Sequence, residues 1–214
     1  MFEFIDIYCE RTGPGLLAEP LNAFTNLSFF IAAFFAFALA RKENALDWRS
    51  SLLIGLTAAM GAGSTLFHTY AQTWAMLTDV LPILCYQIVF IALYSNRIIG
   101  CRRLVSALLL GIFFVAMYSF MQAPRGWLNG SLEYAPAWIF LGGLGLWHLK
   151  HAGREAWGLL AAFGVFTTSL AFRSVDDAIC TSLPIGTHFI WHCLNGLVLY
   201  LCTRAFILND RGTR

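Results

Sequence analysis

The sequence predicts an all-α fold: a polytopic membrane protein built as a seven-transmembrane helix bundle, with its N-terminus outside and its C-terminus in the cytoplasm. Three observations support this. Of the 214 residues, 58% are hydrophobic and 12% are charged, and the mean hydropathy is +0.66. A soluble domain carries roughly 25% charged residues. Seven stretches are apolar enough to span a bilayer, and the basic residues gather on one side of them.

Each predicted span supplies most of the about 20 apolar residues that a helix needs to cross about 30 Å of hydrocarbon. The stretch 103–121 is nearly unbroken, whereas 155–172 is short and interrupted by Gly, Thr and Ser. The seven predicted spans are 21–40, 50–69, 76–95, 103–121, 133–149, 155–172 and 184–208.

The segments outside these spans are too short for a second folded domain. The N-terminal MFEFIDIYCERTGPG is acidic and lacks the basic flank and apolar core of a signal peptide, so we expect it in the mature protein. The chain contains no repeat or low-complexity tract. We expect residues 1–214 to form a single domain.

The distribution of Lys and Arg predicts the orientation, because cytoplasmic loops retain basic residues during insertion. With the N-terminus outside, 11 of the 14 basic residues lie inside. The inner residues are Arg41, Lys42, Arg49, Arg97, Arg102, Arg103, Lys150, Arg154, Arg204, Arg211 and Arg214, and the outer ones are Arg11, Arg125 and Arg173. The net charge of +2 therefore reflects the orientation of the chain in the membrane, and no nucleic-acid binding is expected.

Several polar residues fall near the outer ends of three spans. Ser64 and His68 lie four residues apart near the outer end of 50–69, and Asp79 lies in the first turn of 76–95. If the last span starts at Pro184, the 1.5 Å rise per residue puts His188 and His192 roughly 6 and 12 Å below the outer edge. We therefore expect these polar residues in one membrane layer.

A single buried histidine is most often a core residue bonded to a carbonyl group, and His148 and His151 look like residues of the inner interface. A cluster of ionisable side chains from several helices at one depth is different. Each costs at least a few kcal/mol in hydrocarbon, so the cluster predicts a functional site.

Three neutral imidazoles suit a catalytic zinc ion, which takes three protein ligands and keeps a fourth position for water. The spacing of His188 and His192 brings both rings to one ion, but no Glu lies between them as in H-E-x-x-H. Asp79 is the carboxylate placed to shuttle a proton. Ser64 either assists a developing oxyanion or bonds back to its own helix, and spacing alone leaves both open.

Two further groups of residues have ordinary structural explanations. Gly61 and Gly63 let the second span pack closely on a neighbour. Four tryptophans near the outer interface are expected to be belt anchors rather than substrate contacts. They are Trp74, Trp127, Trp138 and Trp191.

The polar landmarks of the chain resemble those of a known family. GAGSTLFH, then Asp79 eleven residues after His68, then HFIWH are similar to the S-x₃-H, D, H-x₃-H signature of the alkaline ceramidases and the wider CREST superfamily of seven-helix membrane hydrolases. YCER, AEPLNAFTNLSF and VDDAIC resemble the ceramidase branch in particular. The likeness runs from about residue 8 to 200 and is weak in the apolar segments between.

The resemblance implies a zinc-dependent amidohydrolase. His68, His188 and His192 would hold Zn²⁺, Asp79 would activate the zinc-bound water, and Ser64 would assist the oxyanion. The substrate would be a ceramide-like N-acyl lipid entering from the bilayer, and the products a free fatty acid and a sphingoid, or long-chain, base.

The resemblance also implies a disulfide and a calcium site. The disulfide would join Cys9 and Cys180, which the predicted topology places together in the outward-facing, oxidising compartment. Glu10 and Glu19 match two of the family's Ca²⁺ ligands, and carboxylates suit that ion. The chain departs from the family elsewhere, however, with Ile7 and Thr12 at the positions of an Asp and an Asn, Asp6 one residue off and a shorter intervening loop.

Asp176 matches a family aspartate near the pocket mouth, where it either caps the last helix or binds a polar head group. Two other functions remain open: a receptor-like or regulatory CREST protein, and a hydrolase of a different acyl lipid. The short chain with small loops is typical of bacterial proteins, which predicts a multi-pass protein of the inner (plasma) membrane with its active site near the outer leaflet. No obligate protein partner is expected.

Overall fold

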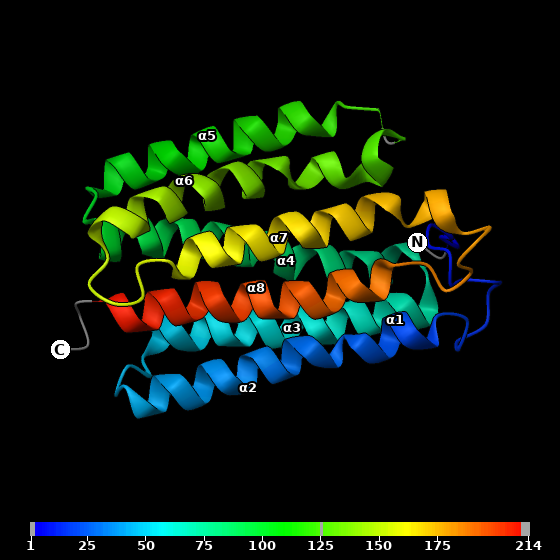
Figure 1. The fold of residues 1–214 in the computed structure, drawn as a ribbon, viewed down its shortest axis with the longest axis horizontal. Coiled ribbons are helices and arrows are strands. Elements are labelled where there is room, and N and C mark those ends of the chain that lie inside the picture. The colour runs from blue at the N-terminus through cyan, green and yellow to red at the C-terminus, as the bar shows by residue number, and fades with distance from the viewer. Residues whose placement is uncertain (1–2, 125, 211–214) are drawn as a thin grey trace.

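The computed structural model describes residues 3–124 and 126–210 as a bundle of long helices lying side by side (Figure 1). Within these residues there is no strand, only an isolated bridge between Phe4 and Gln72. The helices are α1 (Pro20–Thr25), α2 (Leu27–Lys42), α3 (Trp48–Tyr70), α4 (Thr73–Leu93), η1 (Tyr94–Ile99), α5 (Arg103–Met121), η2 (Trp127–Tyr134), α6 (Ala135–His151), α7 (Gly158–Val175), η3 (Asp177–Ile179) and α8 (His188–Asn209).

Six helices among the described residues are long and apolar enough to cross a membrane, so the chain is an all-helical, multi-pass membrane protein. They are Pro20–Lys42, Trp48–Tyr70, Thr73–Ile99, Arg103–Met121, Gly158–Val175 and His188–Asn209. The predicted span 133–149 corresponds to α6, which has 17 residues and is not among the six.

The predicted helix boundaries agree best with the observed ones where the apolar run is least interrupted. The span predicted at 103–121 matches α5 at both ends. The last helix begins at His188, four residues later than predicted, because a turn with Gly186 at φ +63° follows Pro184. His188 therefore lies in the first turn of α8 rather than one turn below it.

Close helix contacts hold the centre of the bundle together. α3 packs along α4, and α8 lies between α2 and α7 (Figure 1). The short α1 contacts both α3 and α8, the two helices that carry the histidine cluster. Apolar side chains such as Leu53, Leu159 and Phe206 fill the interior, while α5 exposes large apolar side chains outward, as expected for a surface in lipid.

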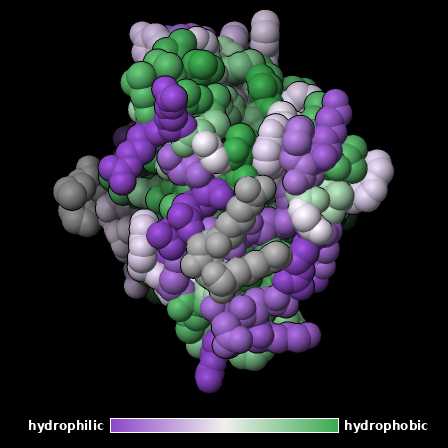
Figure 2. Space-filling model, turned by 90° about the vertical axis from the view of Figure 1, so that its left-hand side faces the viewer, coloured by the Kyte–Doolittle hydropathy of each residue, from purple (hydrophilic) through white to green (hydrophobic). Residues whose placement is uncertain are grey.

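The two ends of the bundle differ in charge. Hydrophilic residues gather over the end that faces the viewer in Figure 2, where α8 ends. Ion pairs at this end join Arg154 to Glu43 and Arg204 of α8 to Glu155. The opposite end carries Arg11 and Arg173, and Arg125, Arg211 and Arg214 lie outside the described residues.

Two expectations about interfacial residues are wrong. Trp191 is 6% exposed and packs against Tyr134, with the Arg173 guanidinium 5.7 Å from its ring centre, so it is no belt anchor. His148 is fully buried and bonded to Tyr94 and to the Glu155 carbonyl group. In both cases a neighbouring helix covers a side chain that its own helix would leave outside.

Candidate metal centre

Three histidines from two helices meet at the end of the bundle where α1 lies. His68 is in the last turn of α3, and His188 and His192 are in the first two turns of α8. One ring nitrogen from each lies within 4.8 Å of the others, and the three residues are at most 2% exposed. The Nε2 atoms of His68 and His192 are 3.1 Å apart. Two nitrogens on one tetrahedral Zn²⁺, with bonds of about 2.0–2.1 Å, lie about 3.3–3.4 Å apart.

The contacts of His192 favour a proton on its Nδ1 atom. The Thr25 hydroxyl donates its single proton to the Leu21 carbonyl oxygen at 2.8 Å. It therefore accepts from the Nδ1–H of His192, at 3.0 Å. This leaves Nε2 of His192 as a lone pair directed towards His68.

The same logic applies to His68, whose Nδ1 lies 2.5 Å from Oε2 of the buried Glu19. Burial acts to raise the pKa of Glu19, but hydrogen bonds from His68, Asn22 and Arg11 outweigh it and lower the pKa below its usual range. Glu19 is therefore an anion that accepts from Nδ1–H, which leaves the Nε2 atom of His68 facing His192. The two Nε2 atoms face each other at 3.1 Å, an arrangement that suits donation from both rings to one metal ion.

His188 is held by its ring face and its backbone. Tyr8 stacks on the imidazole at a centroid distance of 3.7 Å, and the backbone N–H of His188 donates to Asp176 Oδ1 at 2.9 Å. The Nδ1 atom is buried with no hydrogen-bond partner among the described residues. A buried nitrogen without a partner is unusual, and it fits a role for His188 as a metal ligand.

The buried Asp176 caps α8. Its Oδ1 also accepts from the backbone N–H of Thr187 at 2.6 Å, and its Oδ2 accepts from that of Cys9 at 3.3 Å. Of the two roles left open by the sequence, the contacts are those of a helix cap. Cys9 and Cys180 form a disulfide with their Cα atoms 5.1 Å apart, so the N-terminal segment is tied to the start of α8.

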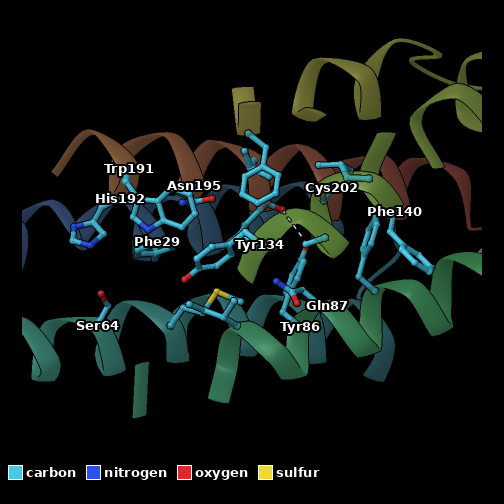
Figure 3. A pocket seen from close by; sticks show the side chains of 18 of the residues that line it. Phe29, Ser64, Tyr86, Gln87, Tyr134, Phe140, Trp191, His192, Asn195 and Cys202 are labelled. Carbon is cyan, nitrogen blue, oxygen red and sulfur yellow. Dashed lines mark hydrogen bonds between the residues drawn. The ribbon is translucent and has the colours of Figure 1, made fainter. Parts of the chain in front are cut away.

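Ser64 and Asp79 lie across the contact between α3 and α4. The Ser64 side chain is buried, interacts with the Asp79 carboxyl group and points towards the cavity that His192 also lines (Figure 3). Asp79 is partly exposed and is directed into the same space.

A cavity extends from the histidines into the bundle between α4, α6 and α8 (Figure 3). Ser64, Asp79, His188 and His192 line one part of it, and the remainder is mostly aromatic and aliphatic. Cys202 lies on its wall ten residues beyond His192, which is about 15 Å further along α8. The shape and lining suit a ligand with one polar end and a long apolar chain.

The structure gives no support to the calcium site expected from Glu10 and Glu19. The Glu10 carboxylate accepts from the backbone N–H groups of Leu21 and Asn22, at 2.7 and 2.8 Å. Glu19 is bonded to Arg11, His68 and Asn22. Within the part of the chain that the structure describes, only the three histidines group three or more His, Cys, Asp or Glu side chains around a possible metal position.

Sequence reasoning missed the residues that hold the histidines in place. Tyr8 and Thr25 belong to the YCER and AEPLNAFTNLSF stretches, which carried the family likeness, but neither residue was given a role. Glu19 was expected at a calcium ion, and Arg11 was counted only as an outer basic residue. A polar run just before an apolar span is a weak signal for such contacts, because it does not identify the partner.

A comparison with known proteins identifies the family to which the chain belongs. A family model described as Ceramidase matches residues 8–212, nearly the whole chain. None of the curated proteins compared with the chain matches it.

Proposed function

The chain belongs to the ceramidase family, and from this premise we propose that it is a zinc-dependent hydrolase that cuts the amide bond of ceramide-like N-acyl lipids within the membrane. The products would be a free fatty acid and a sphingoid, or long-chain, base. Membership of the family by itself points to an amidohydrolase acting on a lipid substrate.

One observation carries the zinc assignment. The Nε2 atoms of His68 and His192 face each other at 3.1 Å while Glu19 and Thr25 hold the opposite ring nitrogens. Partners that orient a ligating imidazole through its other nitrogen are typical of metal sites. Three imidazoles are also a donor set of catalytic Zn²⁺.

His68, His188 and His192 would hold the ion. When bound, it would lower the pKa of a water molecule and polarise the substrate carbonyl group. The Asp79 carboxylate would take the proton released as water adds to the amide carbon, and would return it to the departing amine nitrogen. The Ser64 hydroxyl would donate to the carbonyl oxygen as negative charge develops there.

The cavity supports a lipid substrate. Ser64, Asp79 and the histidines line one end of it, and mostly apolar walls continue between α4, α6 and α8, with Gln87 and Asn195 among them. An acyl chain in this space would place its carbonyl group between Ser64, Asp79 and the histidines. The aromatic walls would also keep bulk water away from the polar end.

We further propose that α6 completes a seven-helix bundle, with the histidine end outward and the C-terminus in the cytoplasm. The uneven distribution of basic residues supports this orientation. In a bacterial cell the site would then face the outer leaflet of the inner membrane.

The deciding experiment measures fatty-acid release from a panel of N-acyl lipids by purified protein, together with the bound metal. His192→Ala is compared with His151→Ala, which removes an exposed histidine at the other end of the bundle. We expect the wild type and His151→Ala to carry about one zinc per chain. His192→Ala should lose zinc and more than about a hundredfold in turnover, because removing even a partner of a metal ligand costs 10- to 100-fold.

Three results would contradict the proposal. Full zinc and full turnover in His192→Ala would exclude the metal assignment. Zinc binding with no product from any lipid would favour a receptor-like or regulatory protein. Release of fatty acid from ester lipids alone would make the chain a hydrolase of another lipid class.

A further inference from the structure

Arg11 is a buried cation next to the metal centre. Its side chain is fully shielded from solvent, and its guanidinium group has three acceptors from different parts of the chain. It donates through Nε to Glu19 Oε1, at 3.1 Å to the Gly13 carbonyl oxygen, and at 2.8 Å to the His68 carbonyl oxygen. Arg11 thus contacts both His68 itself and the carboxylate that holds the His68 ring.

This arrangement disagrees with the calcium ion that the family resemblance implies. Ca²⁺ takes six to eight oxygen ligands, yet the Glu10 oxygens accept from two backbone amides and Glu19 already faces a guanidinium group. A divalent ion beside Glu19 would lie next to a buried positive charge. Asn22 Oδ1 and Asn26 Oδ1 are buried with no hydrogen-bond partner among the described residues, but two amide oxygens fall well short of the six to eight ligands of Ca²⁺.

We propose that the Arg11 guanidinium is the resident cation of this region, positioning His68 through Glu19 and through the His68 backbone, so that the metal centre forms without calcium. This inference rests on the proposed zinc site. Arg11 is a positioning residue, because the guanidinium contacts no ring nitrogen of the cluster.

The geometry favours arginine specifically. The planar guanidinium reaches the Glu19 carboxylate with one edge and a backbone carbonyl with another. A lysine ammonium is a single point of charge on a flexible stem, so it would satisfy one of these acceptors well and the other poorly. Removing the charge would leave Glu19 buried with fewer partners, which is strongly unfavourable.

The test compares wild type, Arg11→Lys, Arg11→Gln and the control Arg49→Gln, in which a part-exposed arginine beside Asp47 at the start of α3 is changed. Zinc affinity is measured by competition with a zinc-selective chelator in calcium-depleted buffer. We expect Arg11→Gln to bind zinc 10- to 100-fold more weakly, Arg11→Lys to be intermediate, and Arg49→Gln to match the wild type. Unchanged zinc affinity in Arg11→Gln would overturn the inference.

A second arm uses the wild type alone, so it holds even if Arg11→Gln fails to fold. Zinc affinity and thermal unfolding are measured with calcium removed and with Ca²⁺ added back. We expect no change larger than about twofold in affinity and no shift in unfolding temperature. A calcium-dependent gain in either would show that the region binds a divalent ion and would refute the role given to Arg11.

The readouts separate this inference from the proposed function. If the wild type binds zinc but cleaves no lipid, the proposed hydrolase activity fails while the zinc titrations still decide the role of Arg11. If the wild type cleaves N-acyl lipids only when calcium is added, the activity stands and the inference about Arg11 fails.

Discussion

Gly63 of α3 and Thr78 of α4 are packed so closely that a Cβ atom at position 63 would lie 1.9 Å from the Thr78 carbonyl oxygen. The next residue on each helix is a proposed catalytic residue, Ser64 and Asp79. Because a backbone carbonyl cannot move aside as a flexible side chain would, this contact sets the spacing between the two.

Gly63→Ala should therefore push α3 and α4 apart. We expect turnover to fall by at least about tenfold and the unfolding free energy to drop by about 1–3 kcal/mol, as in other overpacked contacts. The matched control is Gly55→Ala on the exposed face of α3, where a Cβ meets no atom within 4 Å. Equal turnover in the two variants would show that the spacing of Ser64 and Asp79 is unimportant.

Removing the Asp176 cap should loosen the start of α8. Asp176→Ala leaves the backbone N–H groups of Cys9, Thr187 and His188 without their acceptor, and each unsatisfied buried donor costs about 1–3 kcal/mol. We expect a lower unfolding temperature and weaker zinc binding. Asp177→Ala, which changes the exposed neighbour, should affect neither.

The same pair of variants distinguishes capping from head-group binding. If Asp176 bound the lipid head group instead, Asp176→Ala would raise KM while leaving the unfolding temperature and zinc affinity unchanged.

Filling the far part of the cavity should shorten the preferred acyl chain. Cys202 is buried on the cavity wall, whereas Cys193 on the same helix is exposed. Cys202→Phe removes space for methylene groups, each worth about 0.8 kcal/mol when buried. We expect kcat/KM for long-chain substrates to fall more than for short-chain ones. With Cys193→Phe the dependence of kcat/KM on acyl-chain length should stay that of the wild type. The same dependence in both variants would show that the acyl chain of the substrate does not lie beside Cys202.

The proposed orientation can be read by thiol labelling in a background with the four free cysteines, Cys85, Cys101, Cys193 and Cys202, changed to serine. A membrane-impermeant reagent should label Gly15→Cys on intact cells. Lys42→Cys should react only after the cells are opened, because positions 15 and 42 are exposed on opposite sides of the predicted membrane. Labelling of Lys42→Cys on intact cells would show that the chain has the opposite orientation in the membrane.

The sequence predicted the helix limits well where the length of the apolar run alone determines them. The limits of α5 were correct at both ends, because its apolar run ends in polar residues on both sides. The start of α8 was misplaced because its cap, Asp176, lies on a separate segment before the turn. Trp191 and His148 were assigned to interfaces because burial by another helix leaves no local pattern.

The sequence by itself determined that the chain crosses the membrane several times and that His68, His188 and His192 carry unusual polarity. The cost of placing ionisable groups in hydrocarbon makes such residues visible without coordinates. Only the tertiary structure decided what surrounds them: Thr25 and Glu19 behind two of the rings, Tyr8 stacked on the third, and Arg11 bonded to Glu19 and to the His68 backbone. Those contacts join residues up to 180 positions apart. Their geometry depends on how the helices pack, which no local pattern in the chain records.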